Sequence, residues 1–92
     1  MRFEWDEAKR TANIRKHDID FRGARELFDG ITVTIGDDRV DYGEPRFITF
    51  GLLDGDVVAV AHTETDDAIR LISMRKATRN EAKSYFTRIP AP

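Results

Sequence analysis

The chain of 92 residues contains no cysteine, which excludes disulfide bonds and thiolate metal sites. No run approaches the roughly 18 apolar residues that a membrane-spanning helix needs. The N-terminus, MRFEWDEAKR, is charged from its second residue and has no apolar stretch like that of a signal peptide. We therefore expect a cytoplasmic protein that does not contact a membrane.

The chain also lacks an excess of positive charge, since its net charge is −2. This balance argues against a nucleic-acid partner for the surface as a whole. The charge is unevenly placed, however, because residues 68–92 carry six lysines and arginines against Glu81 alone, a net +5 that leaves −7 for the first 67 residues. The C-terminal quarter could contact phosphate, or its helix and strand ends could simply be rich in basic residues.

The length and a hydrophobic content of 40% predict one small domain over residues 1–92. Asp6 and Asp20 each stand where a helix N-cap is expected, which predicts two consecutive helices that end near His17 and at Asp29-Gly30. The segment TRNE, from Thr78, matches a capping box and predicts a third helix near the C-terminus.

The strands are predicted from alternating apolar residues in MRFEW, ITVTI, and the two segments that flank Asp54-Gly55. Asp-Gly favours a tight type I′ hairpin, and this turn places Phe50 opposite Ala59 and Phe47 opposite His62. One hairpin face is then wholly apolar and is expected to lie beneath the helices. The predicted class is α+β, a twisted antiparallel sheet with two N-terminal helices packed on one face and a C-terminal helix, and the opposite face is expected to be open.

That mixed face carries polar residues inside the strand pattern. If the next hairpin loop is centred on Asp66, His62 opposes Arg70, and Glu64 lies beside them. An imidazole, a carboxylate and a guanidinium on a rigid sheet could cleave an RNA phosphodiester without a metal, with His62 or Glu64 transferring protons and Arg70, helped by Arg75 or Lys76, binding phosphate.

The same residues have a plainer interpretation as a cross-strand ion pair worth ~0.2–1 kcal/mol. The face would then dock a partner protein without catalysis. There is no glycine-rich phosphate loop, and no ligand spacing requires a metal, so no cofactor is expected. Trp5 and Tyr42 could stack on bases, although Trp5, next to a helix N-cap, is more economically a core residue.

Several separated segments resemble the BrnT family, the toxin half of a type II toxin-antitoxin pair. They span nearly the whole chain and are FEWDEAKRTANIRKH, DDRVDYGEPRFITFGLLDG, VAHTE and RLISMRKATRNEAKSY. The resemblance implies a fold similar to the RelE-like ribonucleases and an RNase that arrests translation and growth. It also implies a BrnA-type antitoxin that neutralises the toxin by direct binding and carries the DNA-binding fold through which the complex contacts operator DNA.

The resemblance also marks individual positions. Alongside the catalytic candidates His62, Glu64 and Arg70, it supports Arg46, Ser73, Arg75 and Lys76 as substrate-binding residues. The other positions that the family pattern marks are Lys9, Asn13, Lys16, His17, Asp41, Tyr42, Gly43, Glu44 and Thr63. The low overall positive charge leaves open whether RNA is cut free or on the ribosome.

Overall fold

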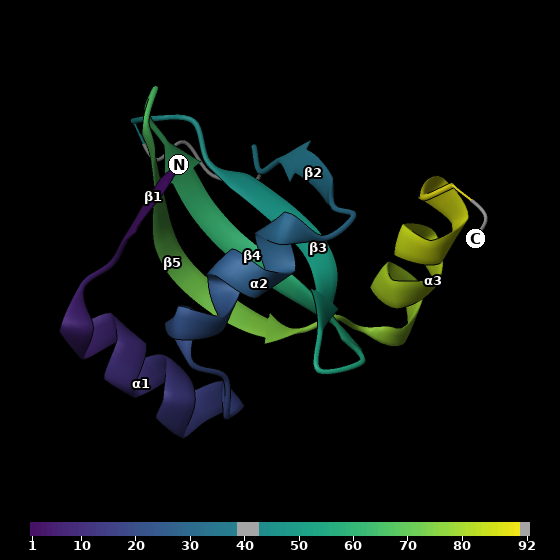
Figure 1. Cartoon of the computed structure of the whole chain (residues 1–92), viewed down its shortest axis with the longest axis horizontal. Coiled ribbons are helices and arrows are strands. Elements are labelled where there is room, and N and C mark those ends of the chain that lie inside the picture. The colour runs from purple at the N-terminus through teal and green to yellow at the C-terminus, as the bar shows by residue number, and fades with distance from the viewer. Residues whose placement is uncertain (39–42, 91–92) are drawn as a thin grey trace.

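The computed structural model describes residues 1–38 and 43–90 (Figure 1). Asp41 and Tyr42, which the family pattern marks, lie outside these residues. Within the described ranges the elements are β1 (Arg2–Glu4), α1 (Glu7–His17), the 3₁₀ turn η1 (Phe21–Gly23), α2 (Ala24–Asp29), β2 (Val33–Gly36), β3 (Phe47–Leu53), β4 (Asp56–Glu64), β5 (Ala68–Lys76) and α3 (Arg79–Arg88). No helix in these ranges combines the length and the hydropathy needed to cross a bilayer.

The helices begin where the polar caps predict. The Asp6 carboxylate accepts hydrogen bonds from the backbone N–H groups of Ala8, at 2.8 Å, and Lys9, and Asp20 caps η1 in the same way. At α3 the reciprocal capping box is complete, since Thr78 bonds the Glu81 N–H and Glu81 bonds the Thr78 N–H. These bonds satisfy donors that the first helical turn leaves without partners.

The strands form one sheet in the order β1-β5-β4-β3-β2. The α+β class is confirmed. The sheet is nevertheless mixed rather than wholly antiparallel, because β1 pairs with β5 in parallel. The hairpins that connect β3, β4 and β5 fix the direction of β5. Strand β1 lies along the outer edge of the first residues of β5, where it pairs with the backbone groups from Ala68 to Arg70.

The register of the β3–β4 hairpin is confirmed. Phe50 lies opposite Ala59 and Phe47 lies opposite His62. Asp54 and Gly55 adopt φ values of 52° and 86°, as a type I′ turn requires. Hairpin geometry therefore determines which side chains share each face.

The prediction of which face would be open was wrong. Helix α2 and the η1 turn cover the face that carries Val58, Val60 and His62, and they form a core there together with Leu71 and Met74 from β5 (Figure 1). This face is more apolar than the β3–β4 hairpin suggests, because β5 supplies Leu71 and Met74.

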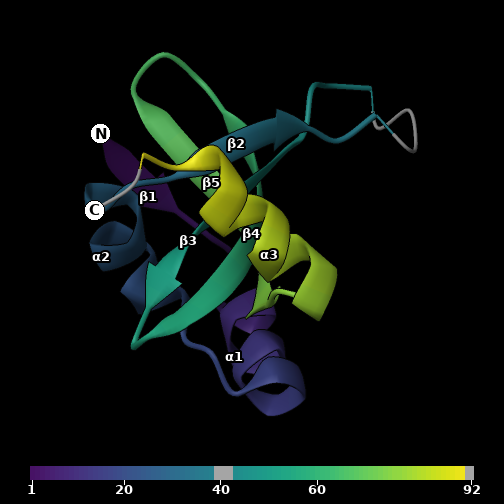
Figure 2. The same cartoon turned by 90° about the vertical axis from the view of Figure 1, so that its right-hand side faces the viewer.

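The helices also do not gather on one face. Helix α3 packs on the opposite side, where Tyr85 contacts a second cluster that contains Phe50, Val57 and Ala59 (Figure 2). The Tyr85 hydroxyl donates a hydrogen bond to the Ile31 carbonyl at 2.7 Å, which ties α3 to the segment before β2. The surface left for chemistry is therefore at the β5 side of the sheet and around α1.

Candidate active site

Strand β5 presents three of the predicted site residues on one face. Arg70, Ser73 and Arg75 pair with Thr63, Ala61 and Ala59, which are alternate residues of β4 and so point the same way.

The odd spacing from Arg70 to Ser73 is possible because the register shifts between Ala61 and His62, which leaves Ile72 as an extra residue. Arg70 is exposed and Ser73 is half-buried. The bulge thus aligns a guanidinium and a hydroxyl that a regular strand would separate.

Helix α1 lies along the edge of this strand and forms a groove with it. The groove has a volume of ≈230 Å³. We call it the α1–β5 groove, and its lining residues are Lys9, Ala12, Asn13, Lys16, His17, Ile72 and Ser73. Two exposed lysines and a half-buried histidine therefore face Ser73. Such a set of side chains suits a phosphate group, because cations neutralise it and hydroxyls hydrogen-bond to it.

Asn13 fixes the helix against the strand. Its Nδ2 donates hydrogen bonds to the carbonyls of Met74 and Ile19, both at 2.9 Å, and its Oδ1 accepts one from the Met74 N–H at 3.0 Å. The amide thus bonds the outer edge of β5 beyond the point where β1 ends, as a neighbouring strand would (Figure 1). Because Asn13 is buried, these bonds hold the groove at a fixed width.

The predicted pairing of His62 with Arg70 was wrong. His62 lies opposite Leu71, and Arg70 lies opposite Thr63. The turn is centred between Asp66 and Asp67 rather than on Asp66, since the Thr65 N–H bonds the Ala68 carbonyl. A slip of one residue moves a side chain to the other face, so the imidazole and the guanidinium point to opposite sides of the sheet.

His62 is also sealed beneath the helices. Its side chain is 0% exposed, between the rings of Phe28 and Phe47. Its Nε2 lies 2.7 Å from the Thr49 hydroxyl, which lies 2.7 Å from the Thr34 hydroxyl. Burial lowers the pKa of His62, although the nearby Glu64 carboxylate opposes this effect. The imidazole therefore has no surface exposed to solvent in this structure.

Glu64 stands between His62 and solvent. Its Oε1 lies 3.6 Å from Nδ1 of His62, and the glutamate side chain is 42% exposed. Nδ1 itself has no hydrogen-bond partner among the described residues. The structure thus brings His62 and Glu64 together but separates both from Arg70, and their catalytic roles stay a prediction.

The remaining predicted substrate-binding residues are dispersed. Two N–H groups of Arg75 donate to the two carboxylate oxygens of Glu81 at 2.7 and 3.0 Å, which holds the pKa of Glu81 at about 2. Lys76 pairs with Val58, so it lies on the face opposite Arg75, and its Nζ is 3.5 Å from Asp56. Arg46 lies immediately before β3 and is half-buried. Arg75 therefore shares a face with Ser73 but is engaged by Glu81, and Lys76 lies on the opposite face.

The sequence matches a known protein family over residues 5–81, and this family is described as the ribonuclease toxin BrnT of type II toxin-antitoxin systems. The match covers most of the chain. The chain belongs to the BrnT family. No curated protein matches it. Because a type II toxin is opposed by a protein antitoxin, membership in this BrnT family implies an antitoxin partner.

Reasoning from the residues alone missed the contribution of α1 to the candidate site of this BrnT chain. In the sequence, only the family resemblance marks the basic side of that helix. A usable signal was present, because Lys9, Asn13 and Lys16 are spaced i, i+4 and i+7 and so lie on one helical face.

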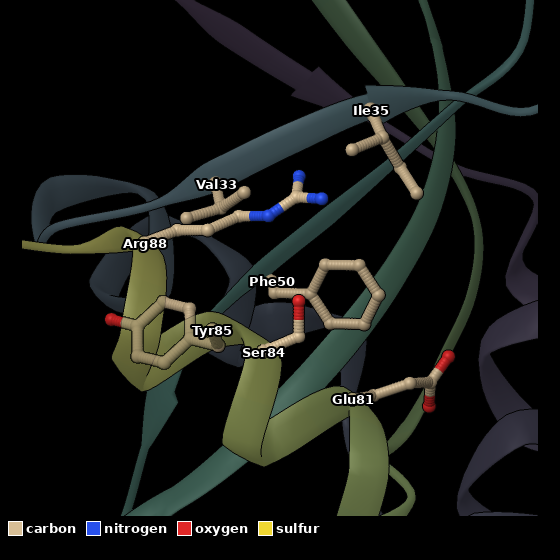
Figure 3. A pocket seen from close by; sticks show the side chains of 7 residues that line it. All are labelled: Val33, Ile35, Phe50, Glu81, Ser84, Tyr85 and Arg88. Atoms are coloured by element: carbon tan, nitrogen blue, oxygen red, sulfur yellow. The ribbon is translucent and has the colours of Figure 1, made fainter.

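A second groove, between α3 and β2, has a different character (Figure 3). Its volume is ≈160 Å³. Val33, Ile35 and Phe50 form its apolar part, and Glu81 and Arg88 extend along it in Figure 3. No group of three or more His, Cys, Asp or Glu side chains is placed for a metal ion anywhere in the described part of the chain. The α1–β5 groove is lined by more basic side chains than this second groove, so it is better suited to bind a phosphate group.

Proposed function

We propose that this BrnT-family chain is a metal-independent endoribonuclease that inhibits translation and growth, and that RNA binds along the α1–β5 groove and the adjacent Arg70. The observation that carries this proposal is the meeting of Lys9, Lys16 and His17 with Ser73 in one groove. Family membership supports the ribonuclease activity. We further propose that the toxin acts in the cytoplasm, where RNA is its substrate.

The proposed reaction is attack of the ribose 2′-oxygen on the adjacent phosphorus. A base takes the 2′-hydroxyl proton, an acid gives a proton to the 5′-oxygen that leaves, and cations stabilise the added negative charge on phosphorus. His17 is the histidine that solvent reaches, so we assign it one of the proton transfers. Lys9, Lys16 and the exposed Arg70 would bind the phosphate.

His62 and Glu64, the other proton-transfer candidates, have a different role in this proposal. The buried imidazole bonds Thr49 across the β3–β4 pair and so orders the sheet from which β5 is positioned. We propose that it positions the site without touching RNA. Glu64, which is partly exposed, then serves mainly to face the unbonded Nδ1 of His62.

Cleavage of a labelled RNA by the purified protein in the presence of a chelator tests the proposal. We expect His17→Ala and Arg70→Ala to lower the cleavage rate by roughly 10²-fold or more while the fold is retained. Lys83→Ala, on the exposed side of α3, is the matched control and should cleave as the wild type does. Full activity in His17→Ala would remove that residue from the mechanism.

His62→Ala separates positioning from catalysis. If His62 acts through the sheet, the variant loses stability, and a conservative His62→Gln, which can keep the bond to Thr49, recovers most of the activity. If His62 itself moves a proton, His62→Gln stays inactive although it is fully folded. Intact RNA under every condition, with partner binding retained, would instead favour the noncatalytic docking module.

We propose a BrnA-type antitoxin as the partner, with operator DNA reached only through the antitoxin. An acidic or amphipathic segment laid over Arg70 and the α1–β5 groove would exclude RNA phosphate directly. The complex should therefore lack cleavage activity until the antitoxin is removed. Full nuclease activity in the intact complex would contradict occlusion of the site.

A further inference from the structure

A separate pocket lies between β1 and the η1–α2 segment. We call it the β1–α2 pocket. Its volume is ≈160 Å³, and it is lined by Phe3, Trp5, Phe21, Arg22 and Arg25. Three aromatic rings and two guanidinium groups thus surround one small space.

The rings are held in fixed orientations. Trp5 packs edge-on against Phe21, with ring centres 6.3 Å apart, and its indole N–H donates to the Glu7 carboxylate at 2.8 Å. Phe3 packs against Phe28 at 5.4 Å. Phe21 is fully buried, whereas Phe3 and Trp5 are half-buried. The pocket therefore offers preformed aromatic surface to a planar ligand.

The two arginines make the pocket cationic. Both are exposed, and neither forms a salt bridge within residues 1–38 and 43–90. The Arg25 guanidinium lies 5.2 Å above the Phe3 ring, and Arg22, three residues earlier, lines the same space. Glu7 lowers the positive charge at one side of the pocket. An anion would offset the repulsion between the two guanidinium groups.

We propose that the β1–α2 pocket binds one nucleotide, whose base stacks on Trp5 and whose phosphate pairs with Arg22 and Arg25. The volume is below the roughly 300–1,000 Å³ of a pocket that encloses a drug-sized ligand, so the pocket would hold no more than one base and the strand would continue outside. Stacking accepts any base, which suits a contact without sequence preference. The inference rests on the proposed function, since it assigns a second RNA contact outside the α1–β5 groove.

Trp5 is the single tryptophan of the chain, so its fluorescence reports on this pocket directly. Titration with a 2′-O-methyl oligonucleotide, which has no free 2′-hydroxyl to attack phosphorus, measures binding without cleavage. We expect saturable quenching, and a separate arm with a free 5′-mononucleotide decides the source of the ligand. Tighter binding of the oligomer assigns the pocket to an RNA strand, and equal affinity assigns it to a free nucleotide.

The double variant Arg22→Ala/Arg25→Ala should bind the oligomer at least roughly tenfold more weakly. Loss of the one phosphate contact that the two arginines share should also lower the slope of log K against log salt by ~0.7. Arg79→Ala, at the start of α3, is the matched control and should bind as the wild type does.

Absence of quenching, or equal affinity of the folded double variant and the wild type, would overturn the assignment. The outcome is independent of the nuclease proposal. Quenching without RNA cleavage would refute catalysis and support nucleotide binding in the pocket. Cleavage without quenching would support catalysis and refute nucleotide binding in the pocket.

Discussion

Gly51 shows how one absent side chain sets the distance between a helix and the sheet. A Cβ at this position would lie 2.7 Å from Cδ2 of Leu27, a side chain of α2 that is fully buried. The close approach brings the Leu27 side chain directly onto the β3 backbone. The sequence contains this glycine inside a strand pattern, but nothing in the pattern shows which residue from α2 occupies the space.

Gly51→Ala should therefore destabilise the fold by about 1–3 kcal/mol, because the fully buried Leu27 side chain must shift to admit the added Cβ. Urea unfolding measures the change. Gly36→Ala is the matched control in β2, since nothing lies within 4 Å of its added Cβ. Equal stability of the two variants would show that the Leu27 contact relaxes easily.

His62 should make folding stability depend on pH. Burial lowers its pKa from the ordinary 6.5, so the unfolded chain binds a proton that the folded chain refuses. The contribution of His62 to the free energy of unfolding is complete above pH 6.5. It is lost as the pH falls below this value, by at most about 1.4 kcal/mol per pH unit.

Unfolding measured between pH 5 and about pH 7.5 should show this loss in the wild type. His62→Gln should remove it, while His17→Gln, the variant of the other histidine, should keep it. The same pH dependence in the wild type and in His62→Gln would mean that the imidazole is hydrated in solution.

At the scale of elements, the sequence predicted features that depend on neighbouring residues better than it predicted the pairing of strands. Helix starts followed from Asp6 and Asp20, since capping involves bonds across only two or three residues. The β3–β4 register followed from Asp54-Gly55 for the same reason. The β4–β5 register did not, because the turn is centred between Asp66 and Asp67 rather than on Asp66, which shifts the pairing by one residue, and a bulge at Ile72 adds a second shift.

Asn13 is the contact that holds α1 to β5. Asn13→Ala should lose about 2–4 kcal/mol of folding free energy, because the buried N–H and carbonyl of Met74 lose their partner. Asn80→Ala, on the exposed side of α3, serves as the control and should change stability little. A loss below about 0.5 kcal/mol would show that water replaces the amide.

The start of α3 depends on Glu81, which caps the helix and also pairs with Arg75. Its pKa is lowered from 4.5 to about 2, so the stabilisation is complete above pH 4.5 and is lost as the pH falls toward 2.

Glu81→Gln should therefore lower the free energy of unfolding by about 1–2 kcal/mol at neutral pH and by much less at pH 2. The loss at neutral pH is modest because the side chain is 28% exposed and water weakens its pair with Arg75. Glu26→Gln, in α2, should follow the wild-type curve. A pH-independent difference between Glu81→Gln and the wild type would assign the effect to packing instead of charge.

At the scale of the whole molecule, the site could be predicted only in part. The polar position of Arg70 inside the strand pattern was evident in the sequence, and Arg70 is exposed on β5, whereas Ser73 was marked only by the family resemblance. It could not show that α1 would lie against that strand, because a contact between residues 13 and 74 leaves no local pattern. The sequence predicted His62 on an open face, because it does not show which face of the sheet the helices cover.

The charge distribution leads to the last prediction. The net charge is −2, so RNA should contact the chain only where cations gather, and the α1–β5 groove with Arg70 is such a place. Expression without an antitoxin should stop growth, and the triple variant Lys9→Ala/Lys16→Ala/Arg70→Ala should restore it, although it remains folded because all three side chains are exposed. A variant of equal charge, Arg15→Ala/Arg79→Ala/Lys83→Ala, should still arrest growth. Growth curves with matched protein levels distinguish the two, and arrest by both variants would place RNA binding elsewhere on the molecule.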